Sequence, residues 1–418
     1  MEHSIKRKLD TGTDSLMSPN KHVKPLKPFD PKKDLAVNES FSLRSLDSSS
    51  NTLSDLESGD SSEEPREGSG REIGSFKTKA PIVAGLVRVQ TPEGLTLVAA
   101  ANKTGEVHVL RSEADGLKPV VQFKLTGSII RRPAIAGDVL YCTTREGNIY
   151  AVRLGLAAHR EGGAPLKPEV LWQGAAGSGI LTEPIATGKI LIVAALKGLN
   201  AYEAYYQDES NKAIGKILWQ YALSGTVSSP ALSSGVIYVG TEDRHLYALN
   251  YGGSKVDMIW DYPANEAVRV KPCISQKGDS VTAASIDGCV FSLHRESGAV
   301  RWVFIVKAPV YSGIISHLMG NEEYFFFGAD NGNFYCLNHA GKQVWAHKTG
   351  AKIRTQALVE GNTICFGAED NHFYGLDVRT GKMIFKFSTD GNVNGEPVIV
   401  DGIAYFGSTD TFVRALQL

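Results

Sequence analysis

The 418-residue sequence lacks the features of exported, membrane-spanning and strongly charged proteins. It has no secretory hydrophobic region and no run of about 18 apolar residues, which argues against export and membrane spans. Its formal net charge of −1 gives the whole chain no bias toward nucleic acid or membrane surfaces. Its cysteines are odd in number and never adjacent: Cys142, Cys273, Cys289, Cys336 and Cys365. We expect buried free thiols in the cytoplasm, with the nucleus as the alternative.

Familiar catalytic motifs are also missing. The sequence holds no Walker loop, no His-Glu-x-x-His motif and no Gly-x-Ser-x-Gly elbow. The segment Gly12–Leu16 mimics a pantetheine attachment site, but Ser18 and Pro19 follow where a helical bundle is required. His245 and His372 occupy equivalent hairpin positions in different repeats, so we do not expect them to share a ligand. We predict no catalytic residue, no metal site and no cofactor.

Aromatic residues are nearly absent from the first 70 residues, which form a separate segment. Ser, Asp, Glu, Lys and Pro dominate it, so it cannot bury enough apolar surface to offset the entropy of ordering. Basic residues gather at Lys6–Lys8 and Lys21–Lys33, and acidic residues gather at Asp55–Glu67. We interpret residues 1–70 as a disordered tether, with a nuclear address or a regulated docking tail as alternatives.

Tryptophan is scarce but regularly spaced. Its five copies lie 41 to 47 residues apart, and each closes a near-copy of one unit: Trp172, Trp219, Trp260, Trp302 and Trp345. Each unit holds four runs of 4 to 6 residues rich in Val, Ile, Tyr and Phe, separated by Gly, Asp and Asn turn signals. The runs are nearly all apolar, as in strands packed on both faces. Such a period predicts an all-β propeller.

The repeats predict eight blades. The tryptophan slot is filled seven times, by Val121, the five tryptophans and Phe385, and we expect the aromatic side chains to dock neighbouring blades. The final unit begins at Gly391 and lacks an outer strand. Ser75–Ile82 aligns with Ala346–Ile353, so an N-terminal strand would complete the last blade and remove two free edges. We predict eight four-stranded blades over residues 71–418, of roughly 43 residues each.

The units resemble the pyrroloquinoline-quinone repeat, the β-propeller family of quinoprotein dehydrogenases. The resemblance is clearest at Tyr335–Trp345 and Tyr374–Phe385, which share Tyr-x-Leu-Asn/Asp, Gly-Lys and an aromatic residue. It covers about five-sixths of the chain and implies the fold, with tryptophan as a docking residue between blades.

The resemblance also implies how a true quinoprotein would hold its cofactor. Members of the family use a vicinal disulfide above the quinone and a calcium ion bound by Glu, Asn and Asp below it. No two cysteines are adjacent here. Four aspartates fall at the same tight turn of four different repeats, where Asp is favoured for its own backbone hydrogen bonds: Asp243, Asp287, Asp370 and Asp410. We therefore do not expect quinone dependence.

Two relatives within this family suggest a function. One is the eight-bladed lipoprotein propeller of the bacterial outer-membrane assembly machine, a protein-binding scaffold whose lipoprotein signal this chain lacks. The other is the C-terminal propeller of the β-alanine-activating enzyme, an ATP-dependent acyl-CoA-synthetase relative whose catalytic domains would be absent here. We expect a monomeric, non-catalytic scaffold that binds protein partners on a propeller face and binds neither membrane nor nucleic acid. The alternative is an enzymatic or small-molecule-binding propeller that uses its central channel.

A candidate binding site follows from the propeller geometry. The innermost strand of each blade lines the channel, and we expect it to end at a proline or its equivalent. The residue before that point, in successive matching blades, is Arg132, Glu183, Ser229, Lys271, Gln356 and Glu396. Neutral residues would suffice structurally, so the four charges predict a polar channel mouth for a charged ligand or a partner's side chain. Alternatively, Arg132 and Lys271 only neutralise Glu183 and Glu396 there.

Overall fold

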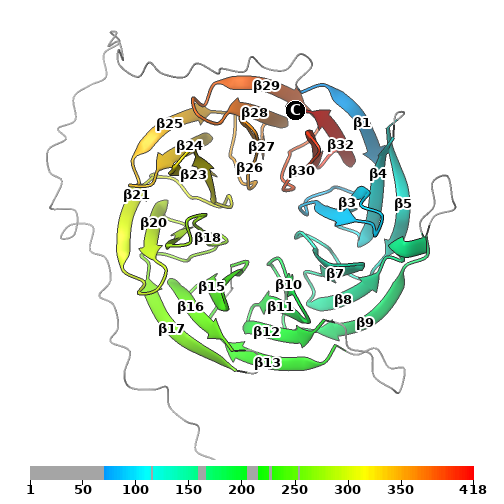
Figure 1. Ribbon diagram of the computed structural model, residues 1–418, viewed down its shortest axis with the longest axis horizontal. Helices are drawn as coiled ribbons and strands as arrows, with labels where there is room; N and C mark the ends of the chain where they lie inside the picture. Colours follow the sequence, from blue (N-terminus) through cyan, green and yellow to red (C-terminus); the bar gives the residue numbers. More distant parts are fainter. Residues whose placement is uncertain (1–69, 114–115, 159–165, 205–214, 226–227, 253–254) are drawn as a thin grey trace, which may run out of the picture.

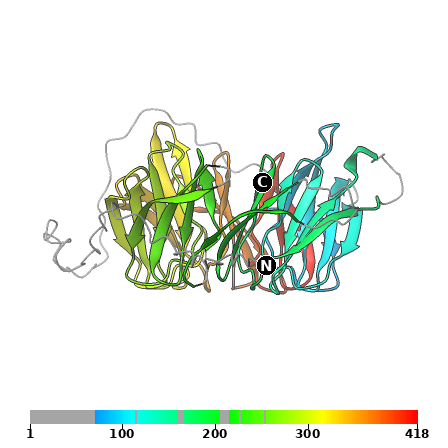
Figure 2. The ribbon, with the colours of Figure 1, turned by 90° about the horizontal axis from the view of Figure 1, so that it is seen from below.

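The apolar repeats fold into eight antiparallel sheets of four strands each. The computed structural model describes residues 70–418, except 114–115, 159–165, 205–214, 226–227 and 253–254. The sheets stand side by side around a central axis as the blades of a propeller (Figure 1). Seen from the side, they form a ring that is wider than it is tall (Figure 2). The predicted eight-bladed all-β fold is therefore confirmed. All but the last residue of the predicted tail, residues 1–70, lies outside the described residues.

Seven blades are each built from four consecutive strands, running from the axis outward. Blade 1 consists of β2 (Val87–Gln90), β3 (Thr96–Ala101), β4 (Glu106–Glu113) and β5 (Gly116–Lys124), and blade 2 consists of β6 (Ala134–Ala136), β7 (Val139–Thr143), β8 (Asn148–Arg153) and β9 (Glu169–Ala175). Blade 3 consists of β10 (Ile185–Thr187), β11 (Ile190–Ala195), β12 (Gly198–Glu203) and β13 (Ile217–Ala222). Blade 4 consists of β14 (Ala231–Ser233), β15 (Val236–Gly240), β16 (His245–Tyr251) and β17 (Val256–Pro263). Blade 5 consists of β18 (Cys273–Ile274), β19 (Ser280–Ala284), β20 (Cys289–His294) and β21 (Val300–Ile305). Blade 6 consists of β22 (Ile315–Met319), β23 (Glu322–Gly328), β24 (Asn333–Asn338) and β25 (Gln343–Lys348). Blade 7 consists of β26 (Leu358–Glu360), β27 (Thr363–Ala368), β28 (His372–Asp377) and β29 (Met383–Ser388).

Blade 8 joins the two ends of the chain. Its inner strands are β30 (Val398–Val400), β31 (Ile403–Gly407) and β32 (Phe412–Gln417), and its outer strand is β1 (Glu72–Lys77). Strand β1 pairs antiparallel with β32, with Ser75 opposite Arg414. The two strands lie side by side at the rim in Figure 1. The predicted closure by an N-terminal strand is therefore confirmed.

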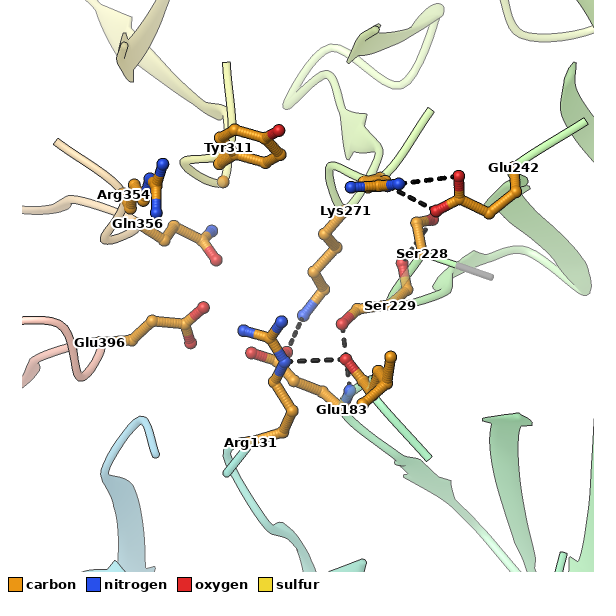
Figure 3. A pocket seen from close by; sticks show the side chains of 13 residues that line it. Arg131, Glu183, Ser228, Ser229, Glu242, Lys271, Tyr311, Arg354, Gln356 and Glu396 are labelled. Carbon is orange, nitrogen blue, oxygen red and sulfur yellow. Dashed lines mark hydrogen bonds and ion pairs between the residues drawn. The ribbon is translucent and has the colours of Figure 1, made fainter. Parts of the chain in front are cut away.

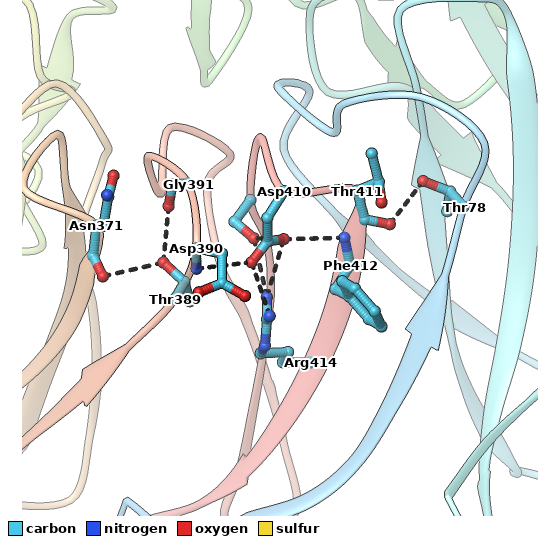
Figure 4. A network of polar contacts seen from close by, with 10 residues as sticks. Thr78, Asn371, Thr389, Asp390, Gly391, Asp410, Thr411, Phe412 and Arg414 are labelled. Carbon is cyan, nitrogen blue, oxygen red and sulfur yellow. Dashed lines mark hydrogen bonds and ion pairs between the residues drawn. The ribbon is translucent and has the colours of Figure 1, made fainter.

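A polar network supports this closure (Figure 4). Asp410 accepts hydrogen bonds from the backbone N–H of Asp390, in the segment that enters blade 8, and from its own hairpin at Phe412 (both 3.1 Å). It also forms an ion pair with Arg414, with 2.7 Å between Nη2 and Oδ2. On the side of β1, the Thr78 hydroxyl donates to the carbonyl of Thr411 at 2.9 Å. Asp410 is thus a turn residue that ties the last blade to its neighbour.

Burial differs between the strands of one blade. Middle strands such as β7 and β19 are buried throughout, because neighbouring blades cover both of their faces. Outer strands alternate instead: in β29, Phe385 is buried whereas Met383 is exposed. The prediction of nearly uniform apolar burial is therefore wrong for the outer strands, which lie at the rim where the blades fan apart. Strand lengths run from two residues in β18 to nine in β5, beyond the predicted 4 to 6.

The outer-strand aromatic residues contact the next blade. Indole N–H groups donate to backbone carbonyls across the interface, from Trp172 to Ala204 at 2.9 Å and from Trp260 to Arg295 at 3.0 Å. The ring of Trp172 also stacks on Tyr202 of blade 3, with centroids 6.0 Å apart. Among the described residues, the only helical segment is a single 3-10 turn, Leu156–Ala158, and no helix could span a membrane.

Candidate channel-mouth site

The loops that lead from each outer strand to the next innermost strand meet around the propeller axis. In every blade, one residue stands two positions before the first residue of the innermost strand. We call these residues the axial ring: Gly85, Arg132, Glu183, Ser229, Lys271, Gly313, Gln356 and Glu396. The ring contains all six residues selected from the sequence, and its other two members are glycines.

The proline that marks this position lies at the start of the innermost strand. Pro133 and Pro184, for example, stand immediately before β6 and β10. The prediction that the strand ends at this proline is therefore wrong. Proline has no N–H to donate to the ladder, so it is tolerated just ahead of a strand.

Charged members of the axial ring form two ion pairs at the channel mouth, and Figure 3 shows the one between Lys271 and Glu183. Lys271 of blade 5 reaches Glu183 of blade 3, with 2.8 Å between Nζ and Oε2. Arg132 of blade 2 reaches Glu396 of blade 8, with 3.1 Å between Nη2 and Oε2. Gly85 lies beneath the second pair, and an ideal Cβ there would fall 2.8 Å from Arg132 Nε. Glycine in blade 1 therefore leaves room for the Arg132–Glu396 pair.

The two glutamates have opposite pKa shifts. Burial raises the pKa of Glu396 to about 7, and the negative charge of nearby Glu183 adds to this effect. Burial also acts to raise the pKa of Glu183, but the positive charges of Lys271 and Arg132 outweigh it and lower that pKa to about 2. Glu183 is therefore ionised at neutral pH, whereas Glu396 is partly protonated.

A second tier of charged side chains surrounds the axial ring. Arg269 forms a bidentate pair with Glu242, at 2.5 and 2.9 Å. Arg354 forms a bidentate pair with Asp330, at 2.8 and 2.6 Å. Its guanidinium also lies over the ring of Tyr311, 4.9 Å from the centroid. Each arginine precedes an innermost strand, and each acid follows the second strand of the preceding blade, so these pairs join adjacent blades.

In four of the eight blades, the residue just before the axial ring is a Ser or Thr that anchors the loop: Thr182, Ser228, Ser312 and Thr355. Ser312 donates its hydroxyl to the carbonyl of Gly328 (2.9 Å) and accepts the N–H of the same glycine (2.8 Å). Thr355 makes the same two bonds with Gly367, at 2.7 and 3.0 Å. In blade 2 this position holds Arg131, which is exposed and donates Nε–H to the carbonyl of Leu181 at 2.8 Å.

These side chains enclose a cavity of about 560 Å³ on the axis. Its lining comes from blades 2 to 8: Arg131; Leu181 and Glu183; Ser228, Ser229 and Glu242; Arg269 and Lys271; Tyr311 and Gly313; Arg354 and Gln356; and Glu396. Five of the six residues selected from the sequence line this cavity, and Arg132 stands beside it.

The sequence selection missed Arg131, Glu242, Arg269, Tyr311 and Arg354. Three of these share one signal, because Arg269, Tyr311 and Arg354 each stand two residues before an axial-ring position in three consecutive blades. Aligning the loops on the axial-ring position and comparing the residues two positions earlier would have found these three.

The residues present do not fit a quinone site of the family type. All five cysteines are buried free thiols. The four turn aspartates are engaged within their own hairpins or with the adjoining loop: Asp243 with Thr241, Asp287 with Ser285 and Cys289, Asp370 with Tyr374 and Gly350, and Asp410 with Ser408 and Phe412. In the described part of the chain, no three His, Cys, Asp or Glu side chains are placed to hold a metal ion. His245 and His372 each contact the backbone carbonyl of a turn aspartate in separate blades.

Comparison with known proteins identifies the family. The family described as outer membrane protein assembly factor BamB matches residues 169–316 and 286–418, more than half of the chain. The chain belongs to this family of PQQ-like repeat propellers. Among its relatives, BamB of Shewanella oneidensis is 24% identical over 256 residues, which cover 57% of this chain and 61% of that protein.

Two further comparisons concern a short sequence match and a shared fold. The quinoprotein alcohol dehydrogenase PedE of Pseudomonas putida is 33% identical over 81 residues, 19% of this chain and 13% of that enzyme. The matched segments thus span less than two thirds of either relative. The fold is shared with Chaetomium thermophilum Sqt1, solved bound to the N-terminus of ribosomal protein L10: TM-score 0.67, 15% identity, 84% of this chain and 100% of Sqt1. None of these relatives supports the resemblance to the β-alanine-activating enzyme.

Proposed function

We propose that this chain is a non-catalytic propeller that binds a protein partner at its channel mouth. The observation that carries the proposal is the cavity of about 560 Å³ into which seven blades direct charged and aromatic side chains. The arginine–carboxylate pairs around it are bidentate and join adjacent blades, so the side chains stand in fixed positions on a rigid ring. Binding residues of propellers and other scaffolds tend to lie on such loops.

Two of the comparisons support a role in protein binding. The matching family is described as an assembly factor, and one structural neighbour was solved with the N-terminus of another protein bound. The chemistry of the mouth also favours binding over catalysis, because the carboxylates of Glu183 and Glu396 are paired with the cations of Lys271 and Arg132.

The test is site-specific photocrosslinking in cells. A photoreactive amino acid is placed at Gln356, in the cavity wall, or at Lys277, an exposed residue of the β18–β19 hairpin at the other end of a blade. We expect one protein to crosslink reproducibly from position 356 and not from position 277. Equal capture from both positions, or capture from neither, contradicts the proposal. A small molecule retained by the purified chain in native mass spectrometry would instead favour the channel-ligand alternative.

Two further parts of the proposal concern context. The first is that the chain acts in the cytoplasm or nucleus, which is compatible with its five free thiols and is tested by fractionation of cells. The second is that the chain is the C-terminal module of an acid-activating ligase related to acyl-CoA synthetases. Its test is the mass of the endogenous protein, because a species no larger than 45.1 kDa would exclude upstream catalytic domains.

A further inference from the structure

The channel mouth carries more positive than negative charge at its centre. Three cations, Arg131, Arg132 and Lys271, stand against two carboxyl groups, those of Glu183 and Glu396. The second tier adds no excess, because Arg269 is matched by Glu242 and Arg354 by Asp330. The centre therefore has a net positive charge even when both glutamates are ionised.

Arg131 supplies this excess charge. Within the described residues, it has no acidic partner, and its one hydrogen bond goes through Nε to the carbonyl of Leu181. The two terminal nitrogens are left to bind a ligand, and Figure 3 shows the guanidinium pointing into the cavity near the Lys271–Glu183 pair. Such a fork matches the two oxygens of a carboxylate.

The position of Arg131 also sets it apart from the repeat. In blades 3, 4, 6 and 7 the equivalent position holds Ser or Thr, whose hydroxyl ties the loop to the second strand, as Ser312 and Thr355 do. In blades 1, 5 and 8 it holds Ala84, Val270 and Gly395, so Arg131 is the one charged residue at this position. Arg131 makes no such bond to its own blade and is exposed. A charged, exposed residue at a position where the other seven blades hold uncharged residues is a candidate for function.

We propose that the channel mouth binds a carboxylate group of an acidic peptide segment, held by the guanidinium of Arg131 and the ammonium of Lys271. This inference rests on the proposed function, in which the same mouth receives a protein partner. The cavity of about 560 Å³ is larger than one carboxylate needs, and Leu181 and Tyr311 offer apolar surface to the rest of the segment.

Protonation of Glu396 should strengthen this binding. The groups that face its carboxyl are Arg132, Glu183 and Lys271. With the pKa of Glu396 raised to about 7, lowering the pH from about 8 to about 6 removes one negative charge from the cavity. The side chains of a glutamate peptide stay ionised over this range, so its affinity should rise as the pH falls.

The experiment measures fluorescence anisotropy of labelled hexaglutamate and hexalysine peptides with the full chain at low ionic strength. We expect hexaglutamate to bind and hexalysine not to bind. Arg131→Ala and Lys271→Ala should each weaken binding about tenfold, the loss expected for one charge-assisted hydrogen bond. Arg131→Lys should weaken it less, and Lys277→Ala, at the opposite end of a blade, should leave it unchanged. Thermal melting of each variant checks that Arg131→Ala, at an exposed site, keeps the fold.

Two controls make the proposal falsifiable. Glu396→Gln should bind at pH about 8 as tightly as the unmodified chain binds at pH about 6, and should lose the pH dependence. Inorganic phosphate and acetate are added as competitors, and displacement by either at the peptide's own concentration would assign the site to free anions and overturn the proposal. Unchanged affinity in both Arg131→Ala and Lys271→Ala would overturn it too.

The two proposals fail in different ways. Crosslinking of a partner from Gln356 with no effect of Arg131→Ala on the peptide or the partner would leave the scaffold function standing and remove the carboxylate site. Binding of hexaglutamate that depends on Arg131, without any partner crosslinked at this face, would leave the carboxylate site standing and remove the scaffold function.

Discussion

The indole of Trp345 lies directly against Gly381 of the next blade, and an ideal Cβ on Gly381 would fall 2.6 Å from two ring atoms. The same contact joins Trp260 to Gly298 and Trp302 to Gly341. The glycines have positive φ, +68° at Gly381, a conformation that other residues rarely adopt. The turn glycine of one blade is therefore the surface on which the aromatic residue of the preceding blade rests.

Gly381→Ala should destabilise the fold by about 2–4 kcal/mol, because it adds a clash with the indole to the strain of a positive φ. Gly320→Ala is the matched control: φ is +64° there, and nothing lies within 4 Å of the added Cβ. Its cost should be about 1 kcal/mol, from backbone strain alone. Chemical denaturation measures both, and equal losses would show that the indole moves aside freely.

Replacing a docking tryptophan with alanine should destabilise the fold more than Gly381→Ala does. Trp219→Ala and Trp302→Ala are each expected to lower the free energy of unfolding by about 3–5 kcal/mol, the range for a large buried aromatic. Losses below about 1 kcal/mol at both positions would contradict a docking role.

Phenylalanine substitutions separate the ring from its N–H group. Trp172 donates to Ala204 at 2.9 Å, whereas the indole nitrogen of Trp219 is buried without an acceptor among the described residues. Trp172→Phe should therefore cost about 1 kcal/mol more than Trp219→Phe. A reversed order in denaturation experiments would show that this bond adds no stability.

Repetition explains how much of the fold could be predicted. Each blade repeats the same strand and turn signals, so blade number and closure by Ser75–Ile82 follow from alignment of the chain with itself. The axial ring follows as well, because it stands at a fixed distance from each innermost strand. The ion pairs within the axial ring could not be predicted in this way. Lys271 reaches Glu183 only because the two side chains are long enough to meet between blades that are not adjacent in the ring. Arg131 was missed because the alignment selected the residue directly before the proline, and only the folded loop shows that the guanidinium one position earlier lines the cavity.

Removal of the closing strand should destabilise the whole ring. Deleting residues 1–80 removes β1 together with the Thr78 hydroxyl bond to Thr411, and leaves β32 with an unpaired edge. Deleting residues 1–68 keeps Gly70, which contacts Phe385 as the turn glycines of other blades contact tryptophan. We expect a lower melting temperature for the longer deletion and little change for the shorter one. Identical melting temperatures would refute the structural role of β1.

Glu183 and Glu396 should each make the free energy of unfolding depend on pH, and the two dependences should have opposite signs. The pKa of Glu396 is raised to about 7 by burial, so its favourable contribution is complete below its unfolded pKa and is lost as pH rises toward 7. The pKa of Glu183 is lowered to about 2 because Lys271 and Arg132 outweigh its burial, so its contribution is present above the unfolded pKa and is lost as pH falls toward 2.

Urea denaturation between pH about 5 and about 8 isolates Glu396, because Glu183 stays ionised in the folded chain over that range. The unmodified chain should lose stability relative to Glu396→Gln as the pH rises, by at most about 3 kcal/mol. Glu183→Gln should be less stable than the unmodified chain at neutral pH, because it leaves Lys271 without its carboxylate. A constant difference between Glu396→Gln and the unmodified chain would mean that Glu396 carries no raised pKa, and that Arg132 alone sets its charge.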